Sequence, residues 1–295
     1  MAEQREVRRL AANLGFPEGP RWRDGVLWFS DIQNGAVRRL APGGPVETVV
    51  ALEGSRPSGL GFMPDGSLLI ASMQGRQLLR WADGKLSLHA DLTGMPGEFL
   101  NDMVVDGEGR AYVGARSNKV SAAVFHRDPG GPDCLLAVEP DGRAWVAAED
   151  LCAPNGTVIS PDGRTLIIAE TYARRVARFD RDPATGRLSG RRLFAQFERT
   201  WPDGACLDAE GAVWVGSPYS NEVVRVFEGS RVADRVSLKG AVACMLGGEG
   251  RRTLFVLAID PASLPPTEDG AAAAAAEHGA CIYALEVPVA GAGWP

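Results

Sequence analysis

The chain has 295 residues, including 36 glycines and 20 prolines, and its net charge is −6. This length is enough to bury a large core, and the many turn-forming residues are typical of an all-β protein. The acidic balance gives no electrostatic footprint for nucleic acid, so we expect no such partner. No run reaches the roughly 18 apolar residues of a membrane helix, and residues 1–10 have no apolar signal core, so we expect no membrane association and a cytoplasmic location.

The cysteines support the same location. They are odd in number and lack the C-x-x-C spacing of zinc and redox motifs. We therefore expect neither a disulfide framework nor a zinc site, but buried free thiols in a reducing compartment. The five are Cys134, Cys152, Cys206, Cys244 and Cys281.

A short alternating pattern over residues 7–12 predicts a first strand, and a unit of four strands follows it. In that unit a strand after Glu18 leads through Asp24-Gly25 into a second strand at residues 26–30. Further strands are expected at 36–41 and 46–51. An Asp-Gly pair suits a tight turn because glycine adopts a positive φ at little cost.

The same unit recurs along the chain, most clearly around Pro154-Asn155-Gly156 and most weakly in its last copy. The first residues of the copies are Glu18, Ser58, Asn101, Asn155, Asp203 and Ala243. A period of roughly 40 to 54 residues with several strands per unit is typical of a β-propeller. We therefore predict one all-β domain over residues 1–295, a six-bladed β-propeller with a central metal site. We expect the N-terminal strand to close the ring by pairing with the last blade.

Two units carry insertions after their second strand, at residues 116–133 and 259–279. Successive strands are antiparallel, so the end of the second strand lies at the same face as the start of the first. We therefore expect both insertions on the face that carries the unit-starting residues. There they would narrow the mouth of the channel as lids.

Equivalent positions of a propeller lie on a ring around its axis, so the unit-starting residues should face one another. Four of them offer oxygen atoms: Glu18, Asn101, Asn155 and Asp203. Two carboxylates and two amide carbonyls suit a hard divalent cation, calcium first and then magnesium or manganese. Zinc also accepts carboxylates, but the set has no His or Cys. The alternative is that these side chains only cap strand starts or bond backbone groups.

The ends of the second strands should form another ring close to the first. Its members are Asp31, Ser72, Ala115, Glu170, Ser217 and Ala258. For the two acidic members we consider three roles: support of the first ring, contact with a substrate, and stabilisation of a turn.

At these residues the sequence resembles the senescence-marker-protein/gluconolactonase/luciferin-regenerating-enzyme family. The matching stretches are Glu18-Gly19-Pro20 with Leu27-Trp28-Phe29-Ser30-Asp31, Leu100-Asn101-Asp102, Pro154-Asn155-Gly156 with Ser160-Pro161-Asp162-Gly163, and Pro202-Asp203-Gly204 with Trp214-Val215. The resemblance implies one catalytic divalent cation at the top of the channel and lactonase activity. It also implies that Glu18, Asn155 and Asp203 bind the cation. Asn101 would be a ligand or a substrate contact, and Asp203 would also be the general base.

One position departs from the pattern of the sugar-lactone members, which have an arginine two residues before the asparagine of the third unit. Here that residue is Phe99, which cannot bond sugar hydroxyls. We therefore predict an apolar wall beside the cation and a less polar lactone or ester as substrate. The full set of predicted substrate contacts is Met73, Phe99, Asn101, Arg116, Glu170 and Trp201.

The favoured hypothesis is a metal-dependent hydrolase that opens a small-molecule lactone, with the cation polarising the carbonyl and water attacking it. A second hypothesis keeps the site but assigns it a phosphotriester or another ester. A third is a non-enzymatic propeller that binds a partner protein and uses the metal to brace its channel. Fold alone does not separate these hypotheses, because propellers serve many functions.

Overall fold

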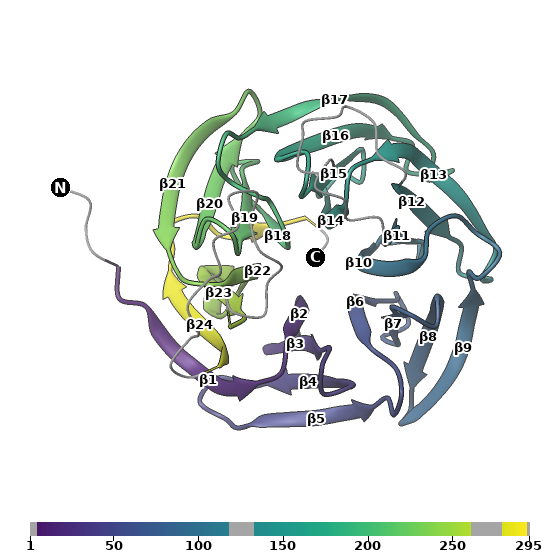
Figure 1. The fold of residues 1–295 in the computed structure, drawn as a ribbon, viewed down its shortest axis with the longest axis horizontal. Coiled ribbons are helices and arrows are strands. Elements are labelled where there is room, and N and C mark those ends of the chain that lie inside the picture. The colour runs from purple at the N-terminus through teal and green to yellow at the C-terminus, as the bar shows by residue number, and fades with distance from the viewer. Residues whose placement is uncertain (1–4, 118–132, 261–278, 294–295) are drawn as a thin grey trace.

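Six antiparallel sheets stand around a common centre (Figure 1). The structure is a computed structural model, and it describes residues 5–117, 133–260 and 279–293. The predicted all-β, six-bladed β-propeller is confirmed. Among the described residues the helical content is a 3₁₀ turn at Glu249–Arg251, and no helix there is long and apolar enough to cross a membrane.

Each of the first three blades runs outward from the centre in chain order. The first blade contains β2 (Pro17–Arg23), β3 (Val26–Asp31), β4 (Ala36–Leu40) and β5 (Val46–Ala51). The second contains β6 (Pro57–Phe62), β7 (Leu68–Ser72), β8 (Gln77–Ala82) and β9 (Lys85–Asp91). The third contains β10 (Phe99–Val105), β11 (Ala111–Arg116), β12 (Asp133–Val138) and β13 (Ala144–Leu151).

The last three blades follow the same plan with two additions. The fourth contains β14 (Pro154–Ile159), β15 (Thr165–Glu170), β16 (Arg175–Arg181) and β17 (Leu188–Gln196). The fifth contains β18 (Ala205–Asp208), β19 (Val213–Ser217), β20 (Glu222–Phe227) and β21 (Arg231–Ser237), with β25 (Gly291–Ala292) at its inner edge. The sixth contains β22 (Ala241–Gly247), β23 (Thr253–Ala258), β24 (Ala280–Glu286) and β1 (Arg8–Leu14).

Both ends of the described chain pair with a blade. The strand predicted at residues 7–12 is β1, which lies antiparallel to β24 with Arg8 opposite Ala284. The C-terminal strand β25 was not predicted, because two residues carry no periodic pattern. It pairs with β18, where Leu207 lies opposite Ala292.

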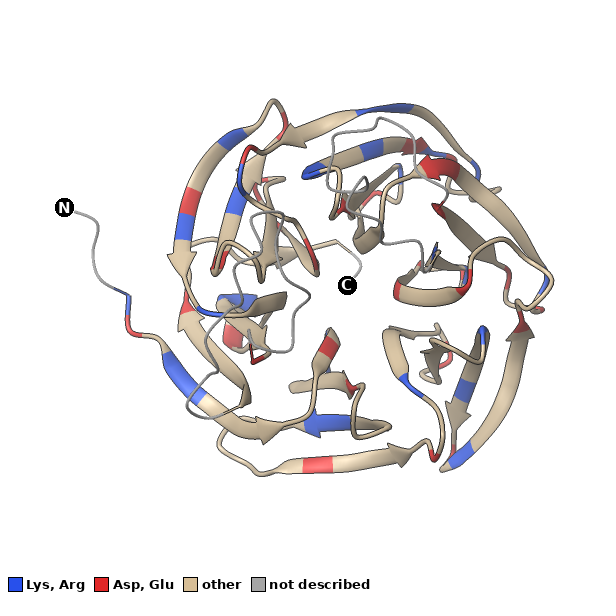
Figure 2. Cartoon of the chain, viewed as in Figure 1, with Lys and Arg blue, Asp and Glu red and all other residues tan. Residues whose placement is uncertain are grey.

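The hydrophobic core lies between neighbouring sheets. One buried cluster joins residues of the second and third blades, including Leu69 and Met103, and another joins the third and fourth, including Tyr112 and Ile168. Charged residues of both signs lie along the outer strands (Figure 2), where pairs such as Arg39 and Glu47 are about half exposed. Exposed pairs of this kind add little stability, so the blades are held together mainly by the apolar contacts between them.

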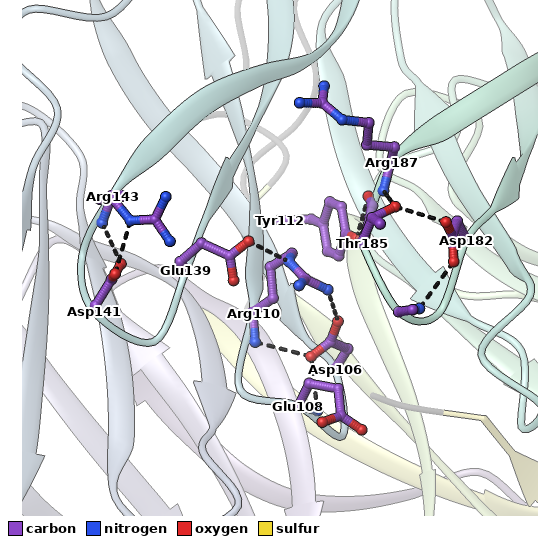
Figure 3. Close-up of polar contacts among 12 residues, drawn as sticks. Asp106, Glu108, Arg110, Tyr112, Glu139, Asp141, Arg143, Asp182, Thr185 and Arg187 are labelled. Carbon is purple, nitrogen blue, oxygen red and sulfur yellow. Dashed lines mark hydrogen bonds and ion pairs between the residues drawn. The ribbon is translucent and has the colours of Figure 1, made fainter.

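One buried polar network also joins two blades, the third and the fourth. Asp106, in the turn after β10, accepts hydrogen bonds from the backbone N–H and the guanidinium of Arg110 at 2.8 and 3.2 Å. It also pairs with Arg181 from β16, and both side chains are 2–3% exposed. Arg181 Nε donates to the Tyr112 hydroxyl at 2.9 Å, and Arg110 Nε donates to Glu139 at 3.1 Å. Figure 3 shows Asp106, Arg110, Tyr112 and Glu139 converging.

We expect Asp106→Asn to lower the free energy of unfolding by about 3 kcal/mol, because it leaves the buried Arg181 guanidinium without its carboxylate. Equilibrium unfolding in urea measures this change. The control is Asp141→Asn, also seen in Figure 3, whose pair with Arg143 is largely exposed at 57% and 78%. That variant should unfold like the wild type. If the two variants unfold at the same urea concentration, the buried network does not hold the blades together.

Candidate active site

The inner strands depart from regular pairing within their first few residues. Register shifts follow Glu18 in β2, Leu100 in β10 and Pro154 in β14. Asn101 and Asn155 lie within these irregularities, and Asp203 lies just before β18, where its N–H donates to Gly216 O at 2.8 Å. Bulges of this kind redirect side chains and occur often beside active sites.

Glycines that follow the unit-starting residues Ser58, Asn155 and Asp203 let consecutive inner strands approach each other closely. A Cβ on Gly59 would lie 2.4 Å from Met103 N, and one on Gly156 would lie 2.5 Å from Asp203 O. A Cβ on Gly204 would lie 2.4 Å from that of Ala243. No real side chain tolerates such distances, so any other residue would push the blades apart. The beginnings of the inner strands therefore form a tight circle.

The third unit has no such glycine, and here the asparagine side chain makes the contact. Asn101 Nδ2 donates to Pro154 O at 3.0 Å, and Asn155 Nδ2 donates to Thr171 Oγ1 at 3.1 Å. Because each amide nitrogen is bonded to a neighbouring oxygen, the carbonyl oxygen of each asparagine points elsewhere and remains available as a ligand.

Two acidic side chains of the circle influence each other. Burial raises the pKa of the Glu18 carboxyl well above its usual range, and the charges of Asp203 and Asp102 raise it further. Burial also raises the pKa of Asp203 to about 7, against the opposing effect of the Arg116 guanidinium. Buried like charges are costly unless a counter-charge lies between them. The pair therefore favours a bound cation.

A third carboxylate nearby, Asp102, already has a partner. Arg21 from β2 places Nη2 3.1 Å from Asp102 Oδ1, and the two side chains are 3% and 5% exposed. Glu18 and Asp203, by contrast, form no ion pair within the described residues, and Arg116 acts on Asp203 through its charge alone. Within the described residues no three His, Cys, Asp or Glu side chains gather as a metal-binding group. A cation here would therefore also need the amide oxygens of Asn101 and Asn155, and this all-oxygen donor set suits calcium.

The second ring supports the first from behind. Asp31 accepts hydrogen bonds from the N–H groups of Gly15 and Phe16 at 3.1 and 3.0 Å, and the Ser217 hydroxyl accepts one from Trp201 N–H at 2.9 Å. These bonds fix the segments that lead into inner strands. These bonds fit two of the predicted alternatives for Asp31, support of the first ring and stabilisation of a turn.

Glu170 occupies the same place in the fourth blade and is fully buried. It accepts a hydrogen bond from Cys152 N–H at 3.0 Å and pairs with Arg175 and Arg191 at 2.7 and 2.8 Å. Both of its oxygens are bonded to the protein. The structure thus places Glu170 behind the ring as a support, away from the position of a substrate contact.

The predicted apolar wall also carries a charged group, the guanidinium of Arg116, which is itself one of the predicted substrate contacts. Phe99 is half-buried beside the circle and its ladder partner is Arg116, whose guanidinium lies 5.4 Å from the centre of the Phe99 ring. Met73 lies further along this side, where its carbonyl accepts a hydrogen bond from Leu100 N–H at 3.0 Å. Its side chain is partly exposed.

Further aromatic residues lie near the circle, and only one of them, Trp201, is among the predicted substrate contacts. The predicted Trp201 packs at a tilt against Tyr219, with ring centres 5.7 Å apart. Tyr172, which was missed, lies 5.2 Å from the Arg116 guanidinium. The pKa of Tyr219 is raised by burial and then by the charges of Tyr172 and Asp203, so this group also lies near the circle. Tyr172 and Tyr219 follow shortly after second-ring residues, and this shared position is the signal that could have revealed them.

The two predicted lids, residues 116–133 and 259–279, lie mostly outside the described residues. Of the first insertion the structure describes the flanks, where Ser117 N–H donates to Asp133 at 2.8 Å and Ala153 N–H donates to the same carboxylate at 2.8 Å. The five predicted free thiols are all buried and unpaired by disulfides.

Comparisons with known proteins identify the family of this chain. Residues 16–260 match the model of the SMP-30/Gluconolactonase/LRE-like region. A 6-deoxy-6-sulfogluconolactonase of Pseudomonas putida is 32% identical over 259 residues, 85% of this chain and 84% of that protein. Regucalcin of Xenopus laevis is 28% identical over 247 residues, 81% of each chain.

A solved structure of regucalcin from Agrobacterium tumefaciens, described as a calcium-binding protein, superimposes with a TM-score of 0.80. It is 25% identical, and the match covers 99% of this chain and 97% of that one. The family match spans the four residues of the circle and the blades that carry them. This chain therefore belongs to the SMP-30/gluconolactonase/LRE-like family, whose members similar to it include a lactonase.

Proposed function

We propose that this protein is a lactonase that depends on a divalent cation. The observation that carries the proposal is the circle of two buried, mutually repelling carboxylates and two amide oxygens at the top of the inner strands. Glu18, Asn155 and Asp203 would hold the cation, with Asn101 as a further oxygen ligand or a substrate contact. The similarity to a lactonase and to a protein described as calcium-binding supports this reading.

Calcium is the cation we favour, because it accepts carboxylate and amide oxygens in flexible geometry. Magnesium, manganese and zinc remain the alternatives to be compared with it. When bound, the cation would supply Lewis-acid polarisation of the substrate carbonyl. The protein's own residues would position the lactone and handle the proton of the attacking water.

Asp203 is the residue that would accept this proton. Glu18 is 8% exposed, whereas Asp203 as a residue is half-buried, so Asp203 is the more accessible of the two to the attacking water. Its backbone is fixed on both sides, since its N–H donates to Gly216 O at 2.8 Å and its carbonyl accepts from Gly156 N–H at 3.2 Å. A carboxylate held in this way is a suitable general base for water attack on an ester carbonyl.

We expect Asp203→Asn to retain more cation binding than activity, because asparagine keeps an oxygen ligand but cannot accept the proton. Hydrolysis should fall by roughly 10²- to 10⁴-fold, while Asp203→Ala should lose both properties. Lactone opening is followed with a pH indicator, and calcium binding by isothermal titration calorimetry. Asp141→Asn, which alters an exposed carboxylate in another turn, is the control and should behave like the wild type. If Asp203→Asn loses calcium binding and activity equally, Asp203 is a ligand only. If either Asp203 variant keeps the activity of the wild type, Asp203 is not part of the active site.

We expect added calcium to raise the melting temperature, since a ligand bound only by the folded state stabilises it, by about 2.7 kcal/mol at a hundredfold excess over Kd. EDTA should reverse the shift and abolish hydrolysis. Glu18→Gln and Asn155→Leu should melt at the same temperature with and without calcium. The same experiment with magnesium, manganese and zinc ranks the cations. Hydrolysis that persists after complete removal of metal would rule out the metal-dependent mechanism.

A further inference from the structure

Arg116 occupies an unusual position at the edge of the circle. It is the last residue of β11 and is partly buried. Its guanidinium lies between two aromatic rings, with centres 5.4 Å away for Phe99 and 5.2 Å away for Tyr172. Aromatic faces attract a guanidinium and hold its plane. The group is therefore pre-oriented, although nothing polar holds it.

Arg116 has no hydrogen-bond or ion-pair partner among the described residues, and its Nε is buried without an acceptor. Other half-buried arginines near this end of the blades also have a buried Nε without a hydrogen bond, but each of them has a polar partner. Arg38 pairs with Asp31 at 2.9 Å, Arg76 donates to Leu92 O at 2.9 Å, and Arg174 donates to Glu198 O at 2.7 Å. A buried polar group without a partner costs stability, so Arg116 is the exception that requires an explanation.

The charges around the circle indicate what the missing partner is. Glu18, Asp102 and Asp203 carry three negative charges when ionised, and Arg21 and Arg116 carry two positive charges. The Arg21 charge is matched within its ion pair with Asp102. A divalent cation bound by Glu18 and Asp203 would neutralise both carboxylates. Among these five groups, the guanidinium of Arg116 would then be the one without a counter-charge.

We propose that Arg116 binds an oxyanion of the substrate, and that the preferred substrate is a lactone carrying a carboxylate. This proposal rests on the proposed lactonase function and names its substrate class. A guanidinium presents two parallel N–H groups that match the two oxygens of a carboxylate. The aromatic rings on either side of the guanidinium hold it in place, so binding requires little additional ordering.

The first experiment compares 5-oxotetrahydrofuran-2-carboxylate with its neutral methyl ester, with ring opening monitored separately from hydrolysis of the methyl ester. Wild type should prefer the anion in kcat/KM, and Arg116→Gln should lower the ratio of kcat/KM for the anion to kcat/KM for the neutral lactone by roughly ten- to hundredfold. Arg116→Lys keeps the charge without the paired N–H groups, so its preference for the anion should lie between those of wild type and Arg116→Gln. If Arg116→Gln lowers kcat/KM equally for both substrates, or only relieves inhibition by the hydroxy-acid product, the proposal is wrong.

The second experiment measures binding without catalysis. Tetrahydrofuran-2-carboxylate and tetrahydrofuran-2-carboxamide differ in charge but not in ring size, and neither is a lactone. The calcium-loaded wild type should bind the carboxylate at least about tenfold more tightly, and Arg116→Gln should bind both equally. Since this readout needs no hydrolysis, it tests Arg116 even if every lactone proves inert, which would overturn only the proposed function. Equal binding of both compounds by wild type would overturn the role of Arg116.

The matched control is Arg56→Gln, which removes the same charge from an exposed residue just before β6 at this end of the blades. It should leave the preference for the anion unchanged. Loss of the preference in this variant would assign it to the general field of the protein instead of to Arg116. The melting temperature of Arg116→Gln should fall only slightly, because the side chain loses two aromatic contacts but no hydrogen bond or ion pair. A fall of more than about 8 °C would indicate a structural role.

Discussion

The close approach of the inner strands is the constraint on which the rest of this structure depends. Gly59, Gly156 and Gly204 bring consecutive strands within a distance that no side chain would allow. The residues beside these glycines come from units far apart in the chain, and the approach places them around one axis. A local steric requirement thus produces a site from residues that are separated by most of the sequence. The same residues could not meet if the strands were spaced by ordinary side chains.

Crowding oxygen atoms on this axis has an electrostatic consequence. Glu18 and Asp203 are forced to share a poorly hydrated space, and the pKa of each carboxyl is raised by burial. The protein neutralises Asp102 with Arg21 but leaves these two carboxylates without a basic partner of their own. A protein under selection for stability alone would gain by replacing such a pair with apolar residues. The proposed cation would offset the cost of keeping both carboxylates there.

Much of this arrangement could be predicted because it follows from a repeat. The spacing of the units and the Asp-Gly turns fix the order of the strands, and equivalence between units fixes which residues share the circle. Single features outside the repeat could not be predicted in this way. The pairing of β25 with β18 depends on a two-residue contact, and the burial of Glu170 beneath Arg175 and Arg191 depends on the side chains of neighbouring strands.

Arg116 shows where the reasoning from equivalent positions fails. Phe99 occupies the position from which an arginine would reach the site, and its apolar side chain alone suggests an apolar pocket. In an antiparallel pair, however, the residue opposite in the ladder projects from the same face of the sheet. Position 116 is opposite position 99, so either can deliver a guanidinium to almost the same place. The phenyl ring then becomes the surface on which the guanidinium lies. The chemistry of this wall is therefore a property of the cross-strand pair, and neither residue can be interpreted without the other.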